Sequence, residues 1–124
     1  MSAMGKTHLK YFLISLFTIL SFNIGCSQLT SPDNPYWVEK LIAEFKSQPV
    51  GNPPQSIWRY EYKGKIVYYI PPQCCDQFSK LYDENGNILG APDGGFSGEG
   101  DGRFTDFFTE RKNEKLIWKD DRQR

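Results

Sequence analysis

Residues 57–70 read Ile-Trp-Arg-Tyr-Glu-Tyr-Lys-Gly-Lys-Ile-Val-Tyr-Tyr-Ile. The first half alternates with a period of two, which places Trp58, Tyr60 and Tyr62 on one face of a strand. Lys63-Gly64 is a two-residue turn signal, and the residues after it are rich in the β-branched and aromatic side chains that favour a second strand. The stretch therefore predicts an antiparallel β-hairpin.

Working outward from this hairpin, the sequence predicts two more strands, at residues 78–83 and 87–91. Asn85-Gly86 between them is one of the strongest short hairpin signals, because both residue types tolerate positive φ. A helix should begin at Pro35 and end before Pro49, since its apolar positions recur at three- and four-residue spacing. We therefore expect an α+β domain, in which an N-terminal helix packs on an antiparallel β-meander of about four strands.

The C-terminal third of the chain is less regular. Residues 93–102 contain five glycines, which predicts a loop because glycine loses the most backbone entropy in a helix or strand. The phenylalanines of residues 104–108 favour a short C-terminal helix, and residues 115–119 are a candidate last strand. The charged tail, residues 120–124, is expected to fray.

Residues 1–25 differ in composition from the rest and predict a lipoprotein signal peptide. Lys6 and Lys10 are their only charges, and the uncharged run that follows is shorter than the roughly 20 residues that a membrane-spanning helix needs. Gly25-Cys26 resembles the lipobox of bacterial lipoproteins, in which the cysteine is acylated with fatty acids that include palmitate. We expect residues 26–34 to tether a single domain, residues 35–119, to a bilayer.

The alternative for this segment is a plain secretory signal cleaved nearby, with Cys26 an ordinary thiol. If Cys26 is acylated, the protein is exported and anchored to the cell membrane by lipid. Ser27, rather than aspartate, follows the cysteine, which favours the outer membrane over the inner one in a cell that has two.

Composition excludes several classes of function. The chain has 15 basic and 15 acidic residues, and loss of Lys6 and Lys10 with the signal would leave it slightly acidic, so we expect no nucleic-acid partner. The only histidine, His8, lies in the signal. Without imidazole the mature chain lacks the base of Ser-His-Asp and Cys-His catalysis and the commonest zinc ligand. We therefore expect no catalytic residues, no metal site and no cofactor.

Cys74-Cys-Asp-Gln-Phe78 and Ala91-Pro-Asp-Gly-Gly95, together with the hairpin sequence, resemble a small family of exported bacterial lipoprotein-type domains of unknown function. The resemblance covers residues 37–107 and implies an exported domain, but it assigns no activity. It also implies two further cysteines at positions that this chain fills with Gly90 and Phe104.

The adjacent cysteines Cys74 and Cys75 have three alternative fates: a vicinal disulfide, two reduced and buried thiols, or a bridge to another molecule. A strained, exposed disulfide would be a redox switch.

The row formed by Trp58, Tyr60 and Tyr62 is either part of the core or a stacking surface for a ligand.

The acidic residues of the glycine-rich loop, Asp93, Glu99 and Asp101, either hold a hard cation or belong to a plain loop.

The function we expect is a membrane-tethered, non-enzymatic binding or accessory module whose protein or small-molecule partner is unknown. The alternative is a thiol–disulfide or small hydrolytic enzyme of the cell envelope that uses Cys74 and Cys75 or the acidic loop.

Overall fold

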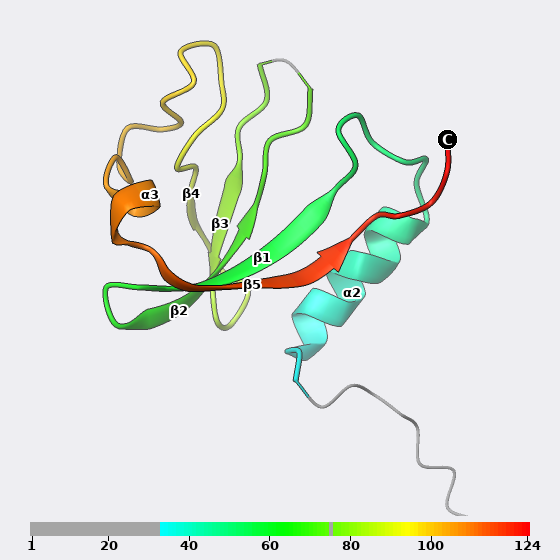
Figure 1. The fold of residues 1–124 in the computed structure, drawn as a ribbon, viewed down its shortest axis with the longest axis horizontal. Coiled ribbons are helices and arrows are strands. Elements are labelled where there is room, and N and C mark those ends of the chain that lie inside the picture. The colour runs from blue at the N-terminus through cyan, green and yellow to red at the C-terminus, as the bar shows by residue number, and fades with distance from the viewer. Residues whose placement is uncertain (1–32, 75) are drawn as a thin grey trace, which may run out of the picture. The chain divides into compact units, whose positions relative to one another are not determined.

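The computed structural model describes residues 33–74 and 76–124, which form five strands and two short helices (Figure 1). In chain order the elements are α2 (Tyr36–Lys46), β1 (Ser56–Tyr62), β2 (Lys65–Ile70), β3 (Lys80–Asp83), β4 (Ile88–Gly90), α3 (Phe107–Glu110) and β5 (Lys112–Lys119). The predicted signal peptide, Cys26 and Cys75 lie outside the described residues. Within the described ranges, no helix has both the length and the hydropathy to cross a bilayer.

The five strands form one antiparallel sheet in the order β4-β3-β2-β1-β5. The predicted hairpin of β1 and β2 is confirmed, and its turn residues Lys63 and Gly64 both have positive φ, as a tight two-residue turn requires. The β3–β4 hairpin is also confirmed. In its turn the Asp83 carboxylate accepts the backbone N–H groups of Asn85 and Asn87, both at 2.9 Å.

The predicted strand from residue 78 begins two residues later, at Lys80. Ser79 instead pairs with the glycine-rich loop, because its hydroxyl and backbone N–H both donate to the Asp93 carbonyl oxygen, at 3.0 and 3.1 Å. Phe78 forms an isolated bridge with Gly94. The start of this segment therefore anchors the loop rather than extending the sheet.

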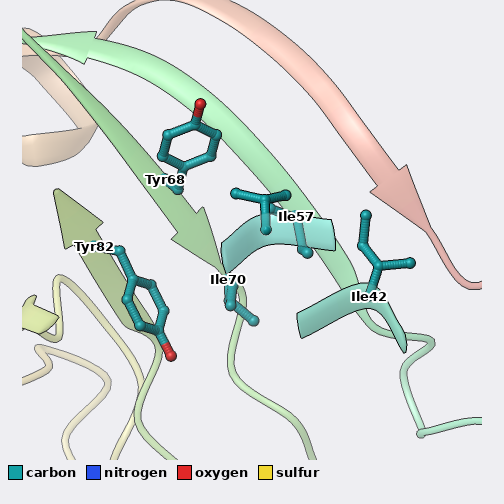
Figure 2. Packing of buried hydrophobic residues seen from close by; sticks show 6 residues of the cluster. Ile42, Ile57, Tyr68, Ile70 and Tyr82 are labelled. Atoms are coloured by element: carbon teal, nitrogen blue, oxygen red, sulfur yellow. The ribbon is translucent and has the colours of Figure 1, made fainter. Parts of the chain in front are cut away.

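Helix α2 covers one face of the sheet with its apolar stripe. Val38 and Ile42 pack against buried side chains of β1, β2 and β3, which Figure 2 shows gathered between helix and sheet: Ile57, Tyr68, Ile70 and Tyr82. The helix begins at Tyr36, one residue after the predicted start at Pro35, and no side chain caps it.

The opposite face carries a second core. Its centre is Phe107 of α3, which is 0% exposed and packs on side chains from β1, β2 and β3: Tyr60, Tyr62, Val67, Tyr69 and Leu81. Figure 1 shows α2 (cyan) and α3 (orange) well apart, on either side of the strands. The sheet is therefore covered on both faces, by α2 on one and by α3 with its preceding loop on the other.

The expected α+β architecture, with an N-terminal helix on a four-stranded meander, is wrong. The described residues are mainly a five-stranded antiparallel sheet, and β5 returns to pair with β1 instead of continuing the meander order. The sequence understated β5 because residues 112–116 are all exposed and lack the alternation that marks a half-buried strand. This strand is held by backbone pairing with β1, a long-range contact that no local pattern encodes.

The charged tail is docked rather than frayed. Arg122 donates to three carbonyl oxygens at the end of α2, those of Phe45, Lys46 and Gln48, at 2.9 to 3.3 Å. The same guanidinium forms a 2.7 Å ion pair with Asp120, whose carboxylate is buried. Because the last carbonyls of a helix have no partner within it, this arginine caps α2 from the far end of the chain.

Candidate functional site

The aromatic row of β1 lies in the second core. Tyr60 and Tyr62 are only 3% and 8% exposed, Trp58 is half-buried, and Phe107 contacts the rings of both tyrosines. A ligand therefore has no open tyrosine ring on which to stack, and the row contributes core packing.

Three tyrosine hydroxyls of this face each meet a carboxylate from the C-terminal third of the chain. Tyr69 lies 2.9 and 3.0 Å from the two oxygens of Asp93, and the other two pairs, at 2.8 and 2.6 Å, are Tyr60 with Glu114 and Tyr62 with Asp106. Burial and the hydrogen bond to Glu114 raise the pKa of Tyr60 to about 12. These hydroxyls therefore stay protonated and donate to the loop at Asp93, to the start of α3 at Asp106 and to β5 at Glu114.

Two of the three acidic loop residues, Asp93 and Asp101, are engaged by hydrogen bonds within the protein. The carboxylate of Asp101 accepts the backbone N–H groups of Ala91 and Arg103 and the Arg103 guanidinium, at 2.7 to 3.0 Å. The bonds from Arg103 hold the pKa of Asp101 at about 2. Across the described residues, no three acidic, cysteine or histidine side chains gather closely enough to hold a metal ion.

Cys74 is disulfide-bonded and exposed, in the segment between β2 and β3. The other two cysteines of the chain, Cys26 and Cys75, lie outside the described residues. Gly90 and Phe104, where the resembling family implies further cysteines, lie side by side: a Cβ at position 90 would be 2.5 Å from the Phe104 ring.

An open pocket of about 570 Å³ lies at the start of α2, on the same face of the sheet as this helix and beyond the part of the face that the helix covers. We call it the polar pocket. Its polar and charged lining comes from five parts of the chain and includes Asp33, Arg59, Tyr68, Glu84, Asn85 and Lys115. A second hollow of about 460 Å³ shares three lining residues with it, Ile66, Glu84 and Asn85.

The floor of the polar pocket is a row of side chains across three strands. Arg59 of β1 stands opposite Lys115 of β5 on one side and opposite Tyr68 of β2 on the other. Directly opposite residues have Cβ atoms about 4.5 to 5.5 Å apart on the same face. Within the described residues, neither Arg59 nor Lys115 forms an ion pair. Two cations are therefore held side by side.

Tyr68 marks the boundary between this floor and the first core. Its ring is buried against α2, while Figure 2 shows its hydroxyl pointing away from Ile57 and Ile70. Burial raises the pKa of Tyr68, and the positive charge of Arg59 partly offsets that effect. The hydroxyl is thus a neutral donor and acceptor beside the two cations.

The acidic wall of the polar pocket is fixed by α2. Trp37 Nε1 donates to the carbonyl oxygen of Glu84 at 2.9 Å, and its ring lies against Gly86, where a Cβ would come within 2.8 Å. Gly86 also has φ of 87°, which favours glycine. Through these contacts the helix sets the position of the turn that carries Glu84, opposite the cations.

Sequence reasoning missed this site. The alternation of β1 did place Arg59 on the face away from the aromatic row, but Lys115 becomes its neighbour only through the pairing of β5 with β1. The one local signal was an arginine on a strand whose other face is apolar.

Residues 43–120 match a family model described as a domain of unknown function, DUF6970. No curated protein and no solved structure matches the chain.

Proposed function

The chain belongs to the DUF6970 family of domains of unknown function, and on that premise we propose that it is an exported, lipid-anchored lipoprotein whose domain is a non-enzymatic binding module. The polar pocket is its binding site. The observation that carries the proposal is the floor of that pocket, where Arg59 and Lys115 stand opposite each other and form no ion pair within the described residues.

Lipid anchoring is supported by the N-terminal sequence. The basic start, the short apolar run and Gly25-Cys26 form a lipoprotein signal, and acylated Cys26 would hold the domain at a bilayer. Because Ser27 rather than aspartate follows the cysteine, we propose the outer membrane as its location in a cell that has two membranes.

A binding role is supported over catalysis by the chemistry of the polar pocket. It combines cations, carboxylates, an amide and a tyrosine hydroxyl, but the chain beyond the signal has no histidine. Groups that stay charged at neutral pH hold a ligand well and transfer protons poorly. Turnover of any hydrolase or thiol-exchange substrate by the purified protein, abolished by one point mutation, would overturn the non-enzymatic assignment.

The anchor is tested by expressing the full chain and its Cys26→Ser variant with a labelled fatty acid. We expect label and a membrane location for the unmodified chain, and neither for the variant. An unmodified chain that keeps Met1, carries no fatty acid and is recovered from the cytosol contradicts the proposal.

The second candidate is a thiol–disulfide enzyme, favoured by one observation: Cys74 is disulfide-bonded and exposed. In such a reaction a substrate dithiol would be oxidised to a disulfide while the Cys74 disulfide is reduced to two thiols. Alkylation followed by mass spectrometry separates the candidates. If Cys74 is labelled without reductant, or if Cys74→Ser leaves every measured thiol-exchange rate unchanged, this candidate is excluded.

A further inference from the structure

Building on the binding module proposed above, we propose that the polar pocket binds a small zwitterionic group, with a phosphate on Arg59 and Lys115 and an ammonium on Glu84. This assigns the ligand a chemical class that accounts for both signs of charge in the pocket.

The phosphate group of the proposed ligand is inferred from the floor of the pocket. Like charges directly opposite each other on neighbouring strands destabilise a sheet, and within the described residues no carboxylate forms an ion pair with Arg59 or Lys115. A bound anion removes that repulsion. Arginine offers a planar fork and lysine a compact point charge, so together they can contact different oxygens of one tetrahedral phosphate.

The ammonium group of the proposed ligand is inferred from the walls of the pocket. Glu84 lines the pocket from the β3–β4 turn, and Asp33 adds a second carboxylate beside the start of α2. Two cations and two carboxylates make a lining without net charge, which would attract a simple anion weakly. A ligand that carries both charges places each one against its opposite. The hydrogen bond from Trp37 to the Glu84 carbonyl keeps that turn in position.

The size and place of the pocket suit a lipid headgroup or a free molecule of the same chemistry. Its volume of about 570 Å³ lies within the range of small-molecule sites. Asp33, at its rim, is seven residues from Cys26, and such a segment spans at most about 25 Å. An acylated Cys26 would thus keep the pocket within reach of bilayer headgroups.

The binding experiment uses the full chain purified in mild detergent, with O-phosphoethanolamine as the probe and calorimetry as the readout. We expect O-phosphoethanolamine to bind at least about tenfold more tightly than inorganic phosphate or ethanolamine alone. Equal affinity for inorganic phosphate and the zwitterion would overturn the proposal, as would no binding of either.

Variants test which groups are responsible. Arg59→Gln and Lys115→Gln should each weaken O-phosphoethanolamine by about tenfold or more, and Glu84→Gln should abolish its advantage over inorganic phosphate. Lys119→Gln is the matched control, because Lys119 is an exposed lysine of the same strand that does not line the pocket. If Lys119→Gln weakens binding as much as Lys115→Gln does, the pocket is not the site.

Two further measurements distinguish a lipid from a soluble source of the ligand, and the lipid-anchor proposal from the zwitterion-site proposal. Vesicles with phosphoethanolamine headgroups that compete with the free probe identify a lipid source, and binding of the free probe alone identifies a soluble one. The full-length Cys26→Ser variant should bind the free probe unchanged. Absence of fatty acid on the unmodified chain would then refute the anchor alone, and absence of probe binding would refute the zwitterion site alone.

Discussion

The Tyr69 hydroxyl sits between the two carboxylate oxygens of Asp93, 2.9 Å from one and 3.0 Å from the other. Asp93 begins the glycine-rich loop, and its backbone also pairs with Ser79. We therefore expect Tyr69→Phe to lower the free energy of unfolding by about 1 to 2 kcal/mol, because it leaves a part-buried carboxylate without its donor. Urea denaturation measures this loss.

The control for Tyr69→Phe is Tyr36→Phe, since Tyr36 is 84% exposed. It should change the unfolding free energy by no more than a few tenths of a kcal/mol. Equal effects of the two variants would mean that the contact with Asp93 does not hold the loop.

Phe107 should be the most costly aromatic residue to truncate. It is fully buried and its ring contacts those of Tyr60, Tyr62 and Tyr69. We expect Phe107→Ala to lower the unfolding free energy by about 3 to 5 kcal/mol, through lost burial and the cavity left behind. Phe96→Ala is the comparison, because Phe96 is 96% exposed and should be nearly silent. A cost below about 1 kcal/mol for Phe107→Ala would contradict its place at the centre of this core.

The parts of this fold that could be predicted from sequence are those set by neighbours in the chain. The alternation around Tyr60, the Lys63-Gly64 turn and Asn85-Gly86 each act within a few residues, and both hairpins are present. Helix α2 was predictable for the same reason, since its apolar stripe is a local pattern.

The parts that could not be predicted depend on long-range pairing. Alternation placed Trp58, Tyr60 and Tyr62 on one face but could not say that α3 would cover them. In the same way, only the pairing of β5 with β1 brings Lys115 to Arg59, so the sequence signals no more of the polar pocket than Arg59 itself. Arg122 looked like part of a loose tail because the carbonyl oxygens that it contacts lie more than seventy residues away.

Arg122 gives a third prediction. Arg122→Gln removes the cap from the last carbonyls of α2 and leaves the buried carboxylate of Asp120 without its ion pair. We expect a lower midpoint of thermal unfolding and faster amide hydrogen exchange at the end of α2. Gln123→Ala, an exposed neighbour, should alter neither. Unchanged exchange in Arg122→Gln would show that the tail does not cap the helix.

Tyr60 predicts how stability changes at alkaline pH. In the folded protein its pKa is raised to about 12, chiefly by burial and then by the hydrogen bond to Glu114, while Arg111 acts in the opposite direction. An unfolded tyrosine ionises near pH 10. Below that pH both states are protonated and the contribution of Tyr60 is complete. From about pH 10 to about 12 only the unfolded state loses its proton, so this contribution is lost as the pH rises.

The matched variant is Tyr60→Phe, which keeps the ring and removes the ionising group. Urea unfolding at pH 9 and pH 11 should show a larger loss of stability for the unmodified chain than for Tyr60→Phe, because the remaining tyrosines are common to both. Tyrosinate absorbance of the folded protein should correspondingly rise only near pH 12 for Tyr60. Parallel losses in the two proteins would mean that Tyr60 ionises as readily folded as unfolded, against its burial beneath α3.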